Sequence, residues 1–321
     1  MTTAFKSYLL EGIQAGGGWV NSHAHFDRAF TATPAMLDEA HARMEEKWTL
    51  IDAMKRGSSE EDYFNRIEKA TLAMIGQGVR AAATFIDIDP ITELRAIKAA
   101  FAVKEKYKEK IDLLLINQVI KGVLDSGAQS WAHKGLEYVD IIGGLPSKDR
   151  PNHEKHLDTI LSWAKETGKM LHVHIDQENN PEERDTELLA RKTMEYGLEG
   201  KVVVVHAISV GAHPLGYRQD VYRLMKDAGM SVVCSPSAAL SMKPVEGLTH
   251  IHNSIAPVPE LLDAGIPVAL GTDNITDIYQ PLVDGDMYTE LRILAEACRF
   301  YDLDALIRIA TVNGRAALGL S

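Results

Sequence analysis

Eight short apolar segments alternate with longer amphipathic segments along the chain. Several short segments are apolar at nearly every position, which is typical of parallel strands covered on both faces. The longer segments repeat apolar residues at helical spacing, and glycine follows the last turn of most of them. The expected strands are residues 18–25, 79–88, 111–120, 139–146, 170–176, 201–209, 230–237 and 266–274, and the clearest expected helices are 59–78, 90–110, 152–168, 183–197 and 216–229.

This order of elements predicts an α/β fold, a (β/α)8 TIM barrel in which each of eight parallel strands is followed by a helix. A doubly wound sheet is the alternative, but it rarely needs eight evenly spaced units, and no G-x-G-x-x-G follows the first strand. One domain over residues 1–321 is the simplest division. Two long insertions, 31–58 and 238–256, fall at the face where such barrels build active sites. They are either lids or ordinary elaborations.

Composition narrows the choice of partners and compartment. The chain has 34 basic and 45 acidic residues, a formal net charge of −11, which argues against a nucleic acid or an anionic membrane as partner. Its two cysteines, Cys234 and Cys298, do not suggest a disulfide framework. The sequence shows neither a secretory signal nor a membrane-spanning apolar stretch, and we expect a cytoplasmic protein.

Metal-binding side chains fall at the ends of four expected strands. An H-x-H pair on one strand is weak evidence by itself, although its two imidazoles share a face. The carboxyl ends of parallel barrel strands all meet at one rim, however, and buried imidazoles and carboxylates without partners are costly. We therefore predict a site for Zn(II), Fe(II) or Mn(II). The residues are His23 and His25 on strand one, His172 and His174 on strand five, His206 on strand six and Asp273 on strand eight.

Three motifs resemble those of the amidohydrolase superfamily. "HAHFDRAFT" (23–31) is similar to the H-x-H-x-D-K-x-F-T of its cytosine deaminase branch, with Arg28 where a lysine is usual. "HVHIDQ" (172–177) resembles the strand-five motif of that branch, and "GTDNITDIYQPLVDGDM" (271–287) its segment around the metal-binding aspartate. The N-isopropylammelide isopropylamidohydrolase group within the branch is the most similar. The N-terminal β-sandwich usual in this branch is missing from the expected elements.

The resemblance implies a metal centre with stated ligands. His23, His25, His174 and Asp273 would bind one divalent ion, Zn(II) or Fe(II), and His206 would be a further ligand or a proton shuttle. His172 is expected to support the site or belong to the core. Two-metal members often carry a modified lysine after strand four, and no lysine follows that strand before position 148, so we prefer a single metal.

The expected chemistry is hydrolysis by a metal-activated water, because a divalent metal lowers the pKa of bound water toward neutrality. Asp273 would accept the proton, and His206 with Asp273 would pass it to the departing nitrogen. Gln177, a further candidate catalytic residue, stands where cytosine deaminases have a proton-moving glutamate. An amide can orient a substrate but cannot shuttle protons at neutral pH. Strand two reads "ATFIDID" where relatives have R-T-H-x-D-x-D. Both changes argue against cytosine itself as the substrate.

Further polar residues at the same rim are candidates for substrate binding. Arg28 is permanently charged and would bind a carbonyl or carboxylate oxygen, or else form a salt bridge at the rim. Trp48 and Tyr279 could stack on a flat ring. For the others, local hydrogen bonding within loops is an equally good interpretation. These candidates are Gln118, Lys121, Ser235, Asn274 and Asp277.

The sequence therefore predicts a metal-dependent hydrolase of a non-peptide C–N bond in a nitrogen heterocycle, by deamination, dealkylamination or cyclic amide hydrolysis. A lactonase or dehalogenase on the same scaffold is the alternative, and a non-catalytic metal-binding barrel is a third reading. The expected partner is a small cyclic molecule. We also expect a homo-oligomer, although the apolar C-terminal stretch 306–320 could either form an interface or cover the barrel.

Overall fold

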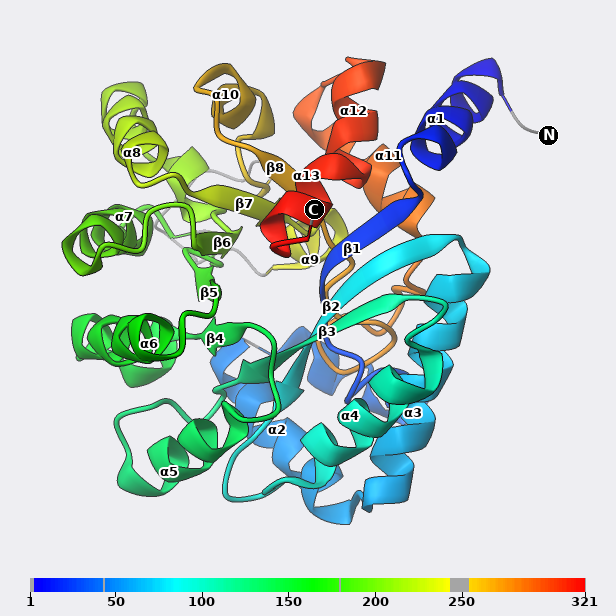
Figure 1. Cartoon of the computed structure of the whole chain (residues 1–321), viewed down its shortest axis with the longest axis vertical. Coiled ribbons are helices and arrows are strands. Elements are labelled where there is room, and N and C mark those ends of the chain that lie inside the picture. Colours follow the sequence, from blue (N-terminus) through cyan, green and yellow to red (C-terminus); the bar gives the residue numbers. More distant parts are fainter. Residues whose placement is uncertain (1–2, 43, 179, 243–253, 321) are drawn as a thin grey trace.

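A ring of eight parallel strands forms the centre of the protein in a computed structural model that describes residues 3–42, 44–178, 180–242 and 254–320 (Figure 1). Each strand lies within its predicted range and is shorter than that range, most of all the fourth and the eighth. The strands are β1 Trp19–Ala24, β2 Val79–Asp87, β3 Asp112–Gln118, β4 Ile142–Gly144, β5 Leu171–Ile175, β6 Val202–His206, β7 Ser231–Cys234 and β8 Val268–Leu270.

Two parallel ladders make up the ring, one of β1 to β3 and one of β4 to β8. Single bridges join them on both sides, between Ala24 and Asp273 and between Ile116 and Ile141. These links bring β1 beside β8 and β3 beside β4, so the strands form the predicted (β/α)8 TIM barrel.

Helices surround the ring on its outer side (Figure 1). The five clearest predicted helices are all present as α3, α4, α6, α7 and α8. Helix α4 begins five residues later than predicted, because the Asp89 carboxylate accepts the backbone N–H groups of Ile91 and Thr92 and holds a turn there. The helices are α1 Ala4–Ala15, α2 Met44–Gly57, α3 Glu60–Gly76, α4 Arg95–Tyr107, α5 Ser126–Gly135, α6 His153–Thr167, α7 Asp185–Tyr196, α8 Leu215–Asp227, α9 Pro236–Ser241, α10 Val258–Asp263, α11 Met287–Cys298, α12 Leu303–Ala310 and α13 Val312–Ala317.

The apolar core has two layers. The larger layer lies between the strands and the outer helices. The smaller fills the barrel, where Val20, Phe85 and Ile116 pack with Leu318, which directly follows α13. The C-terminal helices α12 and α13 thus cover the barrel, which was one of the two roles expected for this stretch. Within the described ranges, no helix combines the length and apolar character required to cross a membrane.

The two predicted insertions both lie near the end of the barrel where the strands finish. Insertion 31–58 contains α2, whose inner face is buried at Trp48 and Ile51. The second insertion, 238–256, begins in α9, and its residues 243–253 lie outside the described part of the chain. A lid function for either insertion stays a prediction.

Candidate metal centre and active-site pocket

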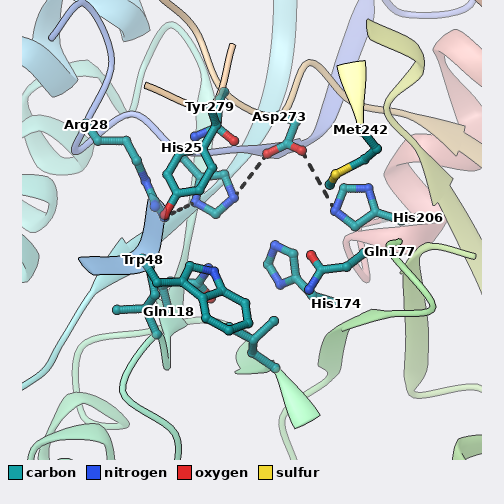
Figure 2. A pocket seen from close by; sticks show the side chains of 13 residues that line it. His25, Arg28, Trp48, Gln118, His174, Gln177, His206, Met242, Asp273 and Tyr279 are labelled. Atoms are coloured by element: carbon teal, nitrogen blue, oxygen red, sulfur yellow. Dashed lines mark hydrogen bonds and ion pairs between the residues drawn. The ribbon is translucent and has the colours of Figure 1, made fainter. Parts of the chain in front are cut away.

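Four strand ends bring four imidazoles and a carboxylate together at the barrel mouth. One oxygen of Asp273 lies 3.3 Å from Nε2 of His23 and 3.2 Å from Nε2 of His25. Its other oxygen lies 3.8 Å from Nε2 of His206 (Figure 2). His23, His25 and His174 place one ligand atom each within 4.8 Å of one another, as do His23, His206 and Asp273.

The chemistry of this cluster fits a divalent metal ion. All five side chains are buried, with at most 5% of their surface exposed. Both ring nitrogens of His23 and of His174 lack hydrogen-bond partners within the described chain. Buried polar atoms are costly without partners, and an ion bound between these nitrogens and the carboxylate would supply them. Imidazole nitrogens and one carboxylate oxygen are the donor set that Zn(II) and Fe(II) prefer.

The protonation states of the cluster favour metal binding. Burial lowers the pKa of His25 and His174 well below the usual histidine value, and it lowers that of His206 to about 4. These rings are therefore neutral at pH 7, the form that coordinates metals. Burial tends to raise the pKa of Asp273, but the adjacent His23 and His25 rings hold it well below its usual range. His25, His174 and His206 thus offer neutral nitrogens beside an ionised carboxylate.

The backbone around the cluster adopts left-handed conformations, with positive φ, that residues other than glycine rarely take. His206 has φ 86° and Asp273 has φ 61°. The N–H groups of Thr272 and Asp273 both donate to the carbonyl oxygen of His23, which holds the chain after β8 against β1. Such strain is typical of functional sites whose surroundings fix the side chains in place.

Phe85, which the sequence reading did not select, forms the apolar support of the imidazoles. Its ring centroid lies 5.0 Å from that of His23, 5.5 Å from His25 and 4.5 Å from His174. Phe85 occupies the position in "ATFIDID" where relatives carry the histidine of R-T-H-x-D-x-D. The unusual strand-two motif was therefore the available signal for it.

A pocket of about 340 Å³, including its open mouth, leads to the cluster (Figure 2). Aromatic, apolar and amide side chains surround it, and Asp273 is the one carboxylate among its described lining residues. Its walls consist of His25, Arg28, Trp48, Gln118, Ile120, Leu145, His174, Gln177, His206, Met242, Asp273, Asn274 and Tyr279.

Arg28 is buried at one side of this pocket. Its Nη2 lies 2.7 Å from Nδ1 of His25 and 3.7 Å from a carboxylate oxygen of Asp87. The guanidinium carbon lies 5.3 Å from the centre of the Tyr279 ring. Arg28 therefore connects a candidate metal ligand with the pocket wall, where it can also meet a substrate.

Gln118, Gln177 and Asn274 supply the amide groups of the pocket. The Gln177 side chain donates to the Ser147 hydroxyl at 3.3 Å, which leaves its oxygen available as an acceptor. The Asn274 amide donates to Asp277, so its oxygen is the group left for a ligand. The side-chain oxygen of Gln118 has no hydrogen-bond partner in the described chain.

Three predicted substrate-binding residues are not among the described side chains that line the pocket. Lys121 instead forms a 2.7 Å ion pair with Asp52 of α2. Asp277 holds its own loop, because its carboxylate accepts the N–H groups of Tyr279 and Gln280 as well as the Asn274 amide. Ser235 is buried behind the pocket, next to Gly271 and His23.

His172 has a different role from His174 although both lie on one strand. Its Nε2 contacts the carbonyl oxygen of Ala317 at 2.8 Å, at the floor formed by α13. The expected shared face is not enough for shared function, because alternate residues of a strand differ in depth along the barrel by about 6–7 Å.

The sequence analysis did not select the pocket residues Ile120, Leu145 and Met242, since single apolar residues carry no sequence signal for a site.

A parallel barrel with a buried histidine and aspartate cluster at its mouth defines the class of barrel hydrolases that work with divalent metals. The model of the amidohydrolase family matches residues 17–321, and the chain belongs to that family. This membership confirms the resemblance inferred from the three motifs.

Two relatives extend the comparison by sequence. An uncharacterised protein of Haemophilus influenzae is 45% identical over 81% of this chain and 95% of its own length. The N-isopropylammelide isopropyl amidohydrolase of Pseudomonas sp. strain ADP is 28% identical over 97% of this chain and 76% of its own length. Together with the family match, such relatives confirm the predicted enzyme class, a hydrolase of carbon–nitrogen bonds other than peptide bonds.

Solved structures with the same fold include the 5-methylcytosine deaminase of Klebsiella pneumoniae liganded with 5-fluorocytosine. It superposes with a TM-score of 0.87 at 23% identity, over 94% of this chain and 74% of that one. The N-isopropylammelide isopropylaminohydrolase of Burkholderia multivorans gives 0.77 at 20% identity, over 95% and 76%. At these identities the likeness supports the fold.

Proposed function

We propose that the protein hydrolyses a carbon–nitrogen bond on a small, flat nitrogen heterocycle and releases ammonia or an amine. The observation that carries this proposal is the cluster of His23, His25, His174 and Asp273 at the inner end of a small aromatic pocket. Unpartnered buried imidazoles beside an ionised carboxylate are suited to a metal and to a reaction that needs activated water.

In this proposal, His23, His25, His174 and Asp273 hold one divalent ion, Zn(II) or Fe(II), and His206 lies beside it. Such an ion would supply a water nucleophile at neutral pH. Asp273 is ionised and accepts the proton of the attacking water. The departing nitrogen must be protonated before it leaves. His206, whose Nε2 lies 3.8 Å from Asp273, would receive that proton through one bridging water and pass it on.

The pocket walls limit the shape and chemistry of the substrate. Trp48 and Tyr279 are large aromatic surfaces suited to a flat ring, and Arg28 is a permanent hydrogen-bond donor suited to a ring oxygen. Because Gln177 is an amide, the protein has no glutamate there to move protons on the ring. We therefore favour oxo-substituted rings other than cytosine, such as the N-isopropylammelide for which one relative is named.

A panel assay tests the proposal. Purified protein loaded with Zn(II) or Fe(II) is incubated with ammelide-type triazines, aminopyrimidines, pterins and cyclic amides, and released ammonia or amine is measured before and after chelation. Chelator-sensitive release from at least one compound is the expected result. Lactones and chloro-heterocycles are assayed in parallel, and turnover of these alone would replace the proposal by the lactonase or dehalogenase alternative. The predicted homo-oligomer is a separate question that light scattering in solution answers.

A further inference from the structure

Lys55, in helix α2, has a fully buried side chain with 0% exposure. Its ammonium group forms an ion pair with Asp89 and lies 3.2 Å from a carboxylate oxygen of Asp87 at the end of β2. Removing a charge from water is costly unless partners compensate for it. The position of Lys55 is therefore determined by these two carboxylates, which belong to the barrel and not to the insertion.

The same face of α2 reaches the active-site pocket. Trp48, Asp52 and Lys55 are spaced by four and three residues, so they lie on one side of the helix. Trp48 lines the pocket, and its ring centroid lies 4.5 Å from Nζ of Lys148. Asp52 forms the ion pair with Lys121. Three contacts that each involve a charged group thus hold this face of α2 over the barrel mouth.

The Lys55 partner Asp87 also contacts the pocket from the other side. One oxygen of Asp87 faces Lys55, and the other lies 3.7 Å from Nη2 of Arg28. Arg28 in turn lies 2.7 Å from Nδ1 of His25. A continuous series of charged and polar groups therefore joins the α2 insertion to a candidate metal ligand, with Asp87 at its centre.

Helix α2 packs on the barrel with a narrow apolar face. Among its described side chains, Trp48 and Ile51 are the buried large apolar ones and Met54 packs half-buried against the core, while Leu50 is 37% exposed. Apolar packing attracts without direction, so the specific polar contacts of α2 fix how the helix is oriented on the barrel. The Lys55 contacts with Asp87 and Asp89 are the most buried of these.

We propose that Lys55 is a positioning residue that docks helix α2 on the barrel, so that Trp48 closes the pocket and Asp87 is held in place against Arg28. Lys55 does not touch the pocket itself and acts through these two neighbours. The proposal concerns the arrangement of the pocket and does not depend on which reaction the protein performs.

The test compares Lys55→Met with Arg56→Met, a matched control on the same helix whose side chain is 67% exposed and lies 3.9 Å from Asp52 within α2 itself, so that its removal breaks no contact with the barrel. Hydrogen exchange of residues 44–57 reports the docking of α2. Acrylamide quenching of Trp48, obtained as the difference between each protein and its Trp48→Phe version, reports closure, because Trp48 is only 7% exposed. We expect Lys55→Met to increase α2 exchange by about tenfold or more and to expose Trp48, while Arg56→Met changes neither.

If Lys55 merely stabilised the whole fold, Lys55→Met would raise hydrogen exchange in β5 and β6 as much as in α2. That result would overturn the proposal. Unchanged α2 exchange and Trp48 quenching in folded Lys55→Met would overturn it as well. Lys55→Arg keeps the cation and is expected to restore part of the protection. If Lys55→Met does not fold, Asp89→Asn takes its place, because Lys55 then retains Asp87. Asp89→Asn is expected to loosen α2 by a smaller factor, and protection equal to wild type would contradict the inference.

Discussion

Single side chains at the barrel mouth are placed by contacts that cross the whole sequence. Asp273 meets His23 and His25, which lie about 250 positions earlier, and Phe85 supports the imidazoles from a third strand. Burial lowers the pKa of His25, His174 and His206, while the adjacent His23 and His25 rings hold the pKa of Asp273 well below its usual range. At the scale of the residue, therefore, the environment selects the protonation states that the proposed chemistry needs.

Asp273→Asn should remove the proton acceptor and weaken the metal centre. We expect the rate of amine or ammonia release, for whichever panel compound is turned over, to fall by about 10²–10⁴-fold. Asp284→Asn is the control, because Asp284 lies exposed in the segment that follows and its carboxylate accepts the backbone N–H of Asp286. Near wild-type turnover by metal-loaded Asp273→Asn would rule out the assigned role.

Glu183 gives a prediction about pH and stability. Burial, with Asp176 nearby, raises the pKa of Glu183 to about 8, whereas a glutamate in the unfolded chain ionises near about 4.3. Between these pH values the folded protein keeps a proton that the unfolded chain loses. The stability from this group is therefore present below about pH 4 and is lost as the pH rises through about 8.

Glu183→Gln should remove this dependence. Urea unfolding at pH 5 and pH 9 is expected to show a loss of roughly 2–4 kcal/mol in wild type that is absent from the variant. Glu195→Gln, an exposed position on helix α7, which begins two residues after Glu183, is expected to behave as wild type. Parallel pH profiles for wild type and Glu183→Gln would show that Glu183 is ionised in the folded state.

At the scale of the element, the two ladders of the barrel meet at the seam between β3 and β4. Here Gly143 lies so close to β3 that an added Cβ would be 2.0 Å from the carbonyl oxygen of Asn117 and 2.9 Å from the Phe85 ring. Its N–H donates to the Asn117 side chain at 2.9 Å. Because Gly143 has no side chain, β4 can approach β3 closely at this seam, and the Phe85 ring can occupy its position beside it.

Gly143→Ala should force β3 and β4 apart at this seam. We expect a loss of about 1–3 kcal/mol in the free energy of unfolding, as for other overpacked cores, measured by urea denaturation. Gly216→Ala in α8 is the matched control, since a Cβ there meets no atom within 4 Å and alanine favours helix. If the two variants are equally stable, the close approach at the seam is not a constraint.

At the scale of the whole molecule, a metal ion would join the two ladders, because its proposed ligands come from β1 in one and from β5 and the end of β8 in the other. Ligand binding to the folded state alone adds about 4 kcal/mol at a free concentration 1,000 times the dissociation constant. For a chain of 321 residues this corresponds to a rise of about 5–10 °C in Tm.

Zinc added to the chelated protein should produce that rise. His174→Gln is expected to lose most of it, whereas His172→Gln, two residues earlier on β5, should keep it because His172 faces the α13 floor. Differential scanning calorimetry with and without Zn(II) measures both. An equal response of the two variants would contradict the assignment of His174 as a ligand.

The sequence by itself determined the eight strands, the barrel and the meeting of His23, His25, His174, His206 and Asp273. The reason is that parallel strands bury both faces, which makes them visible as apolar runs, and all end at one rim. A strand's alternation also fixes which residues share a face.

Only the tertiary structure decided which partner each side chain meets. Lys121 was expected at the substrate and pairs with Asp52, and His172 was paired with His174 by spacing but lies at the barrel floor. Buried Lys55 gave no signal, and its partners Asp87 and Asp89 stood in the quoted motif "ATFIDID" without indicating that a lysine would meet them. Local pattern specifies the direction and depth of a side chain within its element, but the neighbours at that point come from segments far away in the chain, whose positions only packing fixes.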